Sequence, residues 1–219
     1  MVSPQNYNQM LSKLGRLTFF TTLVYLIVLR VLEVIPMVKI DGKLIPPIKD
    51  YKELIEWMLS FGVIPFGGAL LAFFLSSVFE VHNKISKVIQ LRYLWDKYFI
   101  VVPMLKRIGP TPQLSREKVR EIMTGLYYPE VKNIDQHYIH VFWRYALQFW
   151  GMFEHFIVVL VVTITLYIGN GSLPSDKLLW YCVLVFIVTV LHWFFVTTNK
   201  STDQAKQIPE TAIRAFMRQ

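Results

Sequence analysis

The chain has 219 residues, of which 54% are hydrophobic and only 17% charged, and its formal net charge at pH 7 is +8. A soluble domain of this size is rarely so apolar, so the composition argues against the soluble classes and predicts a polytopic membrane protein in contact with the lipid bilayer. The single cysteine, Cys182, excludes an intrachain disulfide and is expected to be a small apolar residue of a helix.

Four apolar runs are long enough to cross a bilayer as helices, which takes roughly 20 residues each. They lie at residues 15–37, 56–78, 147–169 and 178–198. The sequence therefore predicts an all-α polytopic membrane protein with four transmembrane helices in two hairpins. A basic middle segment (80–145) separates the tail and first hairpin (1–79) from the second hairpin and C-terminal tail (146–219).

The distribution of cations predicts the orientation of these spans. The two tails and the middle segment carry 17 of the 23 Lys and Arg residues. Loops rich in Lys and Arg stay on the cytoplasmic side, so both termini and the middle segment are expected in the cytoplasm, with the spans in the inner (plasma) membrane. Anionic lipid on that side accounts for the charge, and we expect no direct nucleic-acid binding.

Two local signals stand out in the first hairpin. Asp41-Gly42, between two short alternating arms, predicts a β-hairpin in the outer loop. In the second run, Gly68, Ala72 and Ser76 recur every four residues, a pattern that lets another helix approach closely in lipid. We interpret these three residues as a helix-packing seam, either within the subunit or between subunits.

The middle segment is expected to begin as a helical continuation of the second run. Ser115 is a candidate N-cap for a short helix through Met123, and a longer helix is expected to start at Asn133 or Asp135 and to continue into the third span. Five cations of this segment are candidates for contact with a partner protein or anionic lipid: Lys84, Lys87, Arg92, Lys106 and Arg107.

A polar stripe follows one face of the longer predicted helix into the third span. Its members recur at spacings of three and four residues: His137, His140, Arg144, Gln148, Gly151 and His155. A polar stripe that enters the bilayer should face protein or water, because an exposed charge there is costly. His137 and His140 could bind a metal, but no third ligand stands near them, so no metal site is predicted.

Glu154 and His155 in the third span, and His192 in the fourth, are the candidates for an intramembrane polar cluster. The depths of His155 and His192 are similar, so these two side chains could meet across antiparallel helices. Three interpretations remain open: a structural hydrogen-bonded cluster, a proton- or ion-conducting site beside a water-filled path, and a bis-histidine haem site. Because haem-binding membrane bundles usually use two such pairs, no cofactor is predicted.

No catalytic motif accompanies these features. The sequence has no glycine-rich phosphate loop, no G-x-S-x-G, no H-E-x-x-H and no convincing pair of carboxylates. We therefore expect that the protein is not an enzyme.

The layout resembles the four-span membrane proteins of bacterial anti-phage systems, in particular the KwaA membrane subunits of Kiwa. The resemblance lies in size, in four spans with inside termini, and in a central segment with His82-Asn83-Lys84-Ile85-Ser86 and Arg92-Tyr93-Leu94-Trp95-Asp96-Lys97. It implies a homo-oligomeric membrane sensor and scaffold that recruits a soluble, nucleic-acid-handling effector protein to the inner membrane face. The alternative is a gated pore, assembled through the seam at Gly68, Ala72 and Ser76 and lined by the polar stripe from Arg144 to His155.

Overall fold

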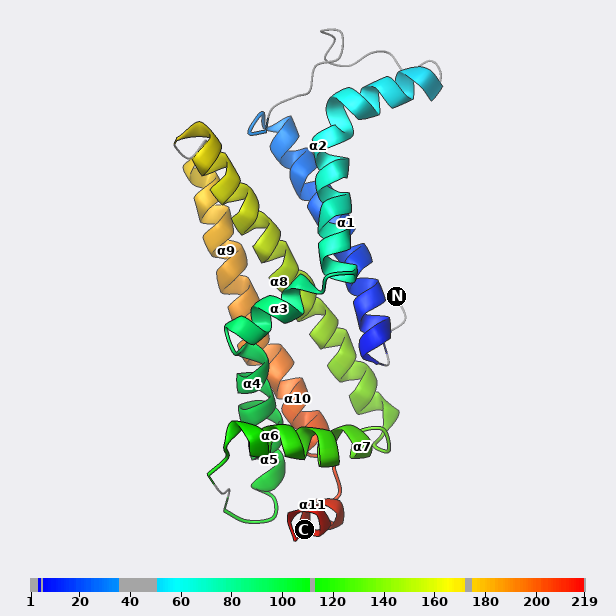
Figure 1. Cartoon of the computed structure of the whole chain (residues 1–219), viewed down its shortest axis with the longest axis vertical. Coiled ribbons are helices and arrows are strands. Elements are labelled where there is room, and N and C mark those ends of the chain that lie inside the picture. Colours follow the sequence, from blue (N-terminus) through cyan, green and yellow to red (C-terminus); the bar gives the residue numbers. More distant parts are fainter. Residues whose placement is uncertain (1–3, 5, 36–50, 111–112, 172–174, 219) are drawn as a thin grey trace. The chain divides into compact units, whose positions relative to one another are not determined.

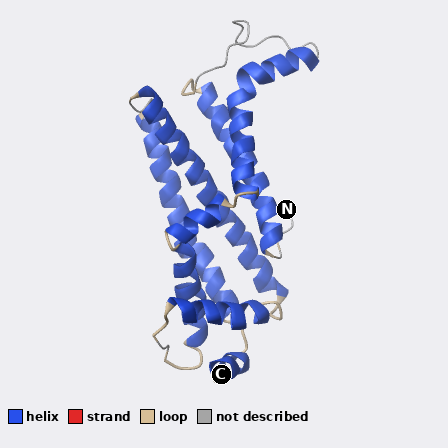
Figure 2. Ribbon diagram, viewed as in Figure 1, coloured by secondary structure: helices blue, strands red, loops and turns tan. Residues whose placement is uncertain are grey.

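The computed structural model describes residues 4, 6–35, 51–110, 113–171 and 175–218, with backbone alone for residues 52–61. Every regular element in these ranges is a helix, and no strand occurs there (Figure 2). The all-α prediction is therefore confirmed for the described part of the chain. The predicted hairpin at Asp41-Gly42 lies outside the described residues.

Within the described residues, three helical stretches are long and apolar enough to cross a membrane: Tyr7–Val31, Gln136–Asn170 and Asp176–Ala205. A fourth is reached only if the bent pair of helices Gly62–Ser77 and Val81–Val88 counts as one span. Membrane-spanning helices are thus compatible with the fold, and three of the four predicted spans are each represented by one long helix.

Two helix boundaries differ from the prediction. The first helix, α1 (Tyr7–Val31), ends before residue 37, and Glu33 follows with a left-handed φ of 58°. The second, α2 (Tyr51–Ser77), does not continue into the middle segment. Glu80 adopts a φ of 46°, a conformation that a helix cannot continue through, and a separate helix begins at Val81.

The helices of the middle segment are short and follow one another closely (Figure 1). They are α3 (Val81–Val88), α4 (Leu91–Trp95), η1 (Asp96–Val101), α5 (Val102–Leu105), α6 (Arg116–Ile122), η2 (Met123–Tyr127) and α7 (Tyr128–Glu130). The predicted N-cap at Ser115 is confirmed, since its hydroxyl accepts a hydrogen bond of 3.2 Å from the Lys118 backbone N–H. The longer helix α8 (Gln136–Asn170) begins beside Asp135, as predicted, and Asp135 Oδ1 accepts a hydrogen bond from the His137 N–H.

The C-terminal third of the chain consists of α9 (Asp176–His192), η3 (Trp193–Thr197), α10 (Thr198–Ala205) and α11 (Glu210–Met217). The elements labelled η are π-helical, and such segments are rare and occur often at functional sites. Each directly continues or precedes an α-helix: η1 leads into α5, η2 follows α6, and η3 follows α9.

The chain divides into two compact units. Unit 1 comprises Met1–Met10, Val81–Trp150 and Ile187–Gln219, and unit 2 comprises Leu11–Glu80 and Gly151–Phe186. All three π-helical elements belong to unit 1. The basic middle segment therefore packs with both ends of the chain rather than standing alone.

The core of unit 1 joins α10 to the π-helix η1. Trp95 is 6% exposed, and its indole N–H donates a hydrogen bond of 2.7 Å to Ser201 Oγ. The Thr202 hydroxyl donates to the carbonyl of Phe99 at 2.9 Å. These bonds connect segments about a hundred residues apart in sequence, so unit 1 depends on long-range contacts.

The core of unit 2 is formed by the faces of α1, α8 and α9. Leu26, Leu29 and Val159 are among its buried side chains, together with Leu178 and Cys182. As expected, Cys182 behaves as a small apolar residue of a helix. Most of the remaining surface of α9 is apolar and exposed, as lipid contact requires.

Candidate functional site

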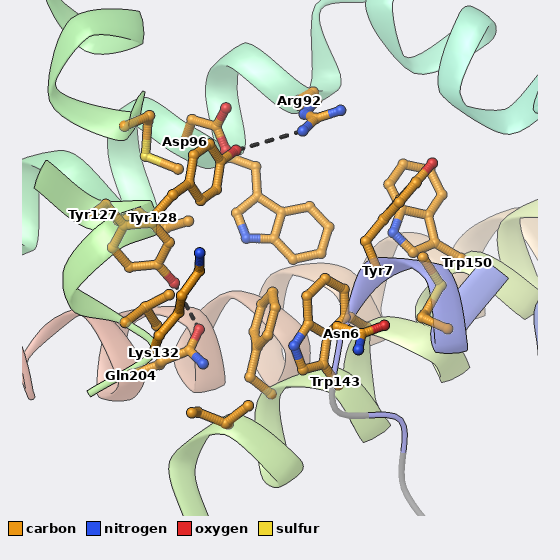
Figure 3. Close-up of a pocket in the computed structure, with 18 of the residues that line it drawn as sticks. Asn6, Tyr7, Arg92, Asp96, Tyr127, Tyr128, Lys132, Trp143, Trp150 and Gln204 are labelled. Carbon is orange, nitrogen blue, oxygen red and sulfur yellow. Dashed lines mark hydrogen bonds between the residues drawn. The ribbon is translucent and has the colours of Figure 1, made fainter. Parts of the chain in front are cut away.

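Unit 1 contains a cavity of about 650 Å³, hereafter the unit 1 cavity (Figure 3). Its wall comes from four separate parts of the chain: the N-terminal residues around Tyr7, the segment from His82 to Ile100, the segment from Met123 to Trp150, and Gln204 of α10. This volume lies within the usual range for small-molecule sites. No single helix could form such a cavity.

Two of the π-helical elements supply parts of this wall. Asp96 and Ile100 come from η1, and Met123 and Tyr127 come from η2. Residues four apart in sequence lie on the same face of a helix, so both members of each pair can face one cavity. Both π-helical elements therefore contribute to the wall of the cavity.

Aromatic side chains make up much of the remaining wall. Trp95 stacks on Trp150 with ring centres 6.2 Å apart and an interplanar angle of 20°, and both rings line the cavity. Tyr7, Phe142 and Trp143 line it as well. Flat apolar walls of this kind favour a ligand with a flat or apolar body.

Arg92, Asp96 and Lys132 are the charged side chains of the wall (Figure 3). The Arg92 guanidinium donates long hydrogen bonds to Asn83 Oδ1 at 3.4 Å and to the Tyr128 hydroxyl at 3.5 Å. Burial raises the pKa of the Asp96 carboxyl to about 6, against the opposing effect of the nearby Arg92 charge. The wall thus has two cations, Arg92 and Lys132, and one carboxyl group, Asp96, whose pKa is raised. Its net charge is positive, which suits an organic anion.

The floor of the cavity is held by a buried hydrogen bond. The Tyr127 hydroxyl donates to Gln204 Oε1 at 2.6 Å, and burial raises the pKa of this hydroxyl, so it stays protonated. Figure 3 shows this bond between η2 and α10. The bond ties the C-terminal part of unit 1 to the wall, so the shape of the cavity depends on α10.

The five predicted contact cations have different environments. Lys84, Lys87 and Lys106 are exposed, and Arg92 is also accessible but lines the cavity. Arg107 instead donates a hydrogen bond of 2.5 Å to the carbonyl of Ile208 and lies 3.7 Å from Glu210. Its guanidinium therefore connects the middle segment to the C-terminal helix α11, a structural role that its charge alone did not indicate.

The predicted polar stripe divides between the two units at Trp150. In unit 1, His137, Arg144 and Gln148 are exposed and His140 is half-buried, with the Arg144 guanidinium 5.4 Å from the centre of the Tyr145 ring. Among the described residues, no group of three or more His, Cys, Asp or Glu is placed to hold a metal ion.

The predicted intramembrane residues have separate partners. His155 in unit 2 lies with Nε2 2.8 Å from the Tyr181 hydroxyl, whereas His192 in unit 1 lies with Nδ1 3.1 Å from the Thr197 hydroxyl. Glu154 is buried in unit 2, where the Thr18 hydroxyl donates a hydrogen bond to Oε2. Each histidine thus has a local hydroxyl partner.

The predicted packing seam faces α1 within unit 2. A Cβ added at Gly68 would lie 2.5 Å from Leu26 Cδ1, so this glycine permits a close approach of the two helices. Ala72 and Ser76 are buried on the same face of α2. Of the two alternatives left open by the sequence, packing within the subunit is the one seen here.

No sequence pattern indicated Asp96, Tyr127, Lys132 or Gln204 as site residues. The available signal was the density of aromatic residues in the middle segment, which contains five of the Phe, Trp and Tyr residues that line the cavity. Such density also occurs in ordinary cores, and only the folded chain brings these segments to one hollow.

Both units fall within a single family. The profile of the YmfE protein family matches residues 6–219. A protein described as "Uncharacterized protein YmfE" from Escherichia coli (strain K12) is 36% identical over 222 residues, covering 97% of this chain and 94% of the relative. No solved structure matches significantly. The match includes the segments that form the unit 1 cavity and the long helices α8 and α9, so the chain belongs as a whole to the YmfE protein family.

Proposed function

We propose that the chain is an oligomeric membrane sensor and scaffold. The unit 1 cavity binds a small organic anion at the inner membrane face, and exposed cations nearby recruit a soluble effector protein. The observation that carries the proposal is the cavity of about 650 Å³ built from four distant segments. A ligand there contacts both chain ends and the middle segment, so its binding can change the surface that a partner meets.

The chemistry of the ligand follows from the wall. Arg92 and Lys132 supply positive charge for a phosphate or carboxylate group, and Trp95, Trp143 and Trp150 supply apolar surface for the body of the molecule. Purified protein examined by native mass spectrometry should carry such an anion. The double variant R92Q/K132Q should lose it, whereas R120Q, which changes an exposed cation outside the cavity wall, should retain it. Retention of the anion by the double variant would contradict this assignment.

The membrane arrangement proposed is four spans with both termini and the basic middle segment on the cytoplasmic side of the inner membrane. Three apolar helices support it, with the bent pair as the fourth crossing, together with the excess of Lys and Arg in the tails and middle segment. Cysteines introduced at Lys206 and Lys177 in a C182A background test the orientation. A membrane-impermeant maleimide added to intact cells should label only the cysteine at position 177.

Helix α3 is the proposed docking surface for the effector. His82 and Ser86 are buried on one of its faces, while Lys84, Lys87 and Val88 are exposed, with Val88 82% exposed. Two cations beside an exposed apolar side chain suit a partner with acidic and apolar groups. Anionic lipid is the other ligand that this face fits, and the following experiment separates the two.

The test is the composition of the particle extracted in mild detergent from its native host. A soluble protein recovered in fixed ratio, and lost from K84E/K87E but not from K200E, would support recruitment of a partner. An assembly containing only copies of this chain would contradict it. Because the layout resembles Kiwa membrane subunits, anti-phage defence is the proposed setting, and deletion of the gene should then increase plating of at least one phage.

A gated pore is the second candidate function. It is favoured by the buried polar side chains of unit 2, among them Thr18, Thr22 and Glu154. This function predicts ion leakage from liposomes that contain the protein alone. Tight liposomes under conditions that trigger the cellular response would argue against it.

A further inference from the structure

Helix α8, which is long and apolar enough to span a membrane, carries a buried carboxyl group. Glu154 of α8 is 4% exposed, and the Thr18 hydroxyl of α1 donates a hydrogen bond to its Oε2. Ionisable residues in spans are costly and usually have a function. Neither the unit 1 cavity nor the proposed docking surface uses Glu154, because it belongs to unit 2.

Polar side chains on one face of α1 extend from this carboxyl group along the helix. Thr18, Thr22 and Tyr25 follow at spacings of four and three residues, which places them on the same face, and they are 2%, 1% and 7% exposed. Seven residues of helix span roughly 10 Å. A continuous polar face therefore leads from the level of Glu154 to that of Tyr25.

Tyr25 belongs to a cluster of three rings contributed by α1, α8 and α9. Its ring stacks on Tyr181 with centres 5.6 Å apart and meets the edge of His155 at 5.5 Å. His155 Nε2 lies 2.8 Å from the Tyr181 hydroxyl. Hydroxyl and imidazole groups can both donate and accept hydrogen bonds, so this cluster has the chemistry to pass a proton.

The same three rings line a second cavity, the unit 2 cavity, with a volume of about 840 Å³. At its other end the lining includes Glu33, Ser175 and Lys177, which lie beyond the end of α1 and at the start of α9. The cavity thus connects the polar helix ends to the rings. Glu154 does not line this cavity and is the residue that precedes His155 in α8.

We propose that Glu154 is a proton-binding site that water reaches from one side through the unit 2 cavity. A proton enters at the helix ends, passes the His155–Tyr181 pair and binds the Glu154 carboxylate; it leaves by the same path. Besides Glu154, the titratable and charged groups in the unit 2 stretches of the packed helices are Lys13, Arg16, Tyr25 and Arg30 of α1, His155 and Tyr167 of α8, and Asp176, Lys177, Tyr181 and Cys182 of α9. The stretch Gly62–Ser77 of α2 contributes none.

This inference does not depend on a ligand in unit 1 or on a partner protein. It assigns a second chemical signal, the proton, to a different part of the molecule. Protonation removes the charge of a buried carboxylate, so it changes the packing preference of α1 against α8. The two proposals can therefore fail separately.

The test is infrared difference spectroscopy of the full chain in nanodiscs after a change of pH. Acidification of the wild type should give protonated-carboxyl bands. One of these bands should be lost in E154Q, whereas E121Q, which changes an exposed carboxylate, should keep it. Thermal unfolding of E154Q checks that this near-isosteric variant is folded. A band that persists unchanged in folded E154Q would overturn the assignment to Glu154.

The rate at which the protonated-carboxyl band of Glu154 forms tests the access path separately. In a C182A background, K177C coupled to a bulky thiol reagent should slow protonation severalfold, because the adduct occupies the open end of the unit 2 cavity. The same adduct at K206C, in unit 1, should leave the rate unchanged. Equal rates for the free and coupled K177C proteins would overturn the path, even if Glu154 itself binds a proton.

Discussion

Unit 1 and unit 2 hold their polar groups in different ways. In unit 1, hydrogen bonds such as Trp95–Ser201 and Tyr127–Gln204 join segments far apart in sequence around a cavity. In unit 2, the buried polar residues Thr18 and Glu154 lie on the facing surfaces of long regular helices. The cavity of unit 1 therefore depends on a few tertiary contacts. The packing of unit 2 depends instead on the close approach of helix faces.

The largest expected effect is the loss of a tertiary contact in unit 1. Trp95→Ala removes a buried ring and leaves Ser201 without its indole donor, so we expect a loss of about 3–5 kcal/mol in the free energy of unfolding. Trp180→Ala in unit 2 is the matched control, because Trp180 is 71% exposed and should change stability little. Unfolding in mixed micelles measures both. Equal losses of stability in the two variants would contradict this difference between the units.

The Asp96 carboxyl in the wall of the unit 1 cavity should make the free energy of unfolding depend on pH. The pKa of Asp96 is raised to about 6 from the ordinary 3.8, so the folded state binds the proton more tightly than the unfolded state. Stability should therefore fall as pH rises from about 4 to about 6 and then level off, by at most roughly 3 kcal/mol at about 1.4 kcal/mol per pH unit.

Asp96→Asn should remove this pH dependence and be more stable than the wild type at pH 7. Asp203→Asn, at an exposed position paired with Lys200, is the control and should keep the wild-type slope. The measurement is the unfolding midpoint at several pH values between 4 and 8. A wild-type slope of the opposite sign would show that Asp96 is stabilised in its charged form.

Arg107 and Lys106 are adjacent cations with different expected effects on stability, because Arg107 binds a backbone carbonyl and Lys106 is exposed. Arg107→Ala removes a charged hydrogen bond to the Ile208 carbonyl and should cost about 1.5–3 kcal/mol of stability. Lys106→Ala, at an exposed side chain, should cost less than about 0.5 kcal/mol. Parallel unfolding curves of the two variants measure the difference, and similar losses would contradict the structural role of Arg107.

The smallest effect is expected from adjacent glycines of α2 in unit 2. Gly68→Val places methyl groups against Leu26 and should cost about 1–3 kcal/mol, because the packed neighbour must move. Gly67→Ala, at a position with nothing within 4 Å of the added Cβ, should be neutral or stabilising by up to about 1 kcal/mol. If Gly67→Ala were instead the more damaging change, α2 would pack through its other face.

Regular features of the fold were predictable from local patterns. Ser115 and Asp135 marked helix starts because their side chains accept hydrogen bonds from nearby backbone N–H groups, an interaction that needs no distant partner. The seam at Gly68 was visible because small residues at four-residue spacing fall on one helix face. The expected continuation of α2 into the middle segment was wrong, since Glu80 adopts a left-handed φ of 46° and no glycine or proline marks this turn in the sequence.

The candidate site was less predictable. Arg92 was identified from its charge, but its four-residue spacing from Asp96 is common on helix surfaces and does not indicate a cavity. Tyr127 and Gln204 are 77 residues apart. Arg107 was grouped with the docking cations because a charge by itself does not show whether it faces solvent or a backbone carbonyl. The burial of Glu154 was consistent with its place in an apolar run, yet its partner Thr18 lies 136 residues away.

By itself, the sequence determined the all-helical class, the long apolar helices and the places where several of them begin, because hydrophobic runs and capping residues act over one or two turns. Three features became visible only in the folded chain: both chain ends pack with the basic segment, a cavity forms among its aromatic rings, and Arg107 binds the Ile208 carbonyl. These outcomes depend on side chains that meet across large sequence separations, where the free energy of packing, rather than local preference, selects the partner.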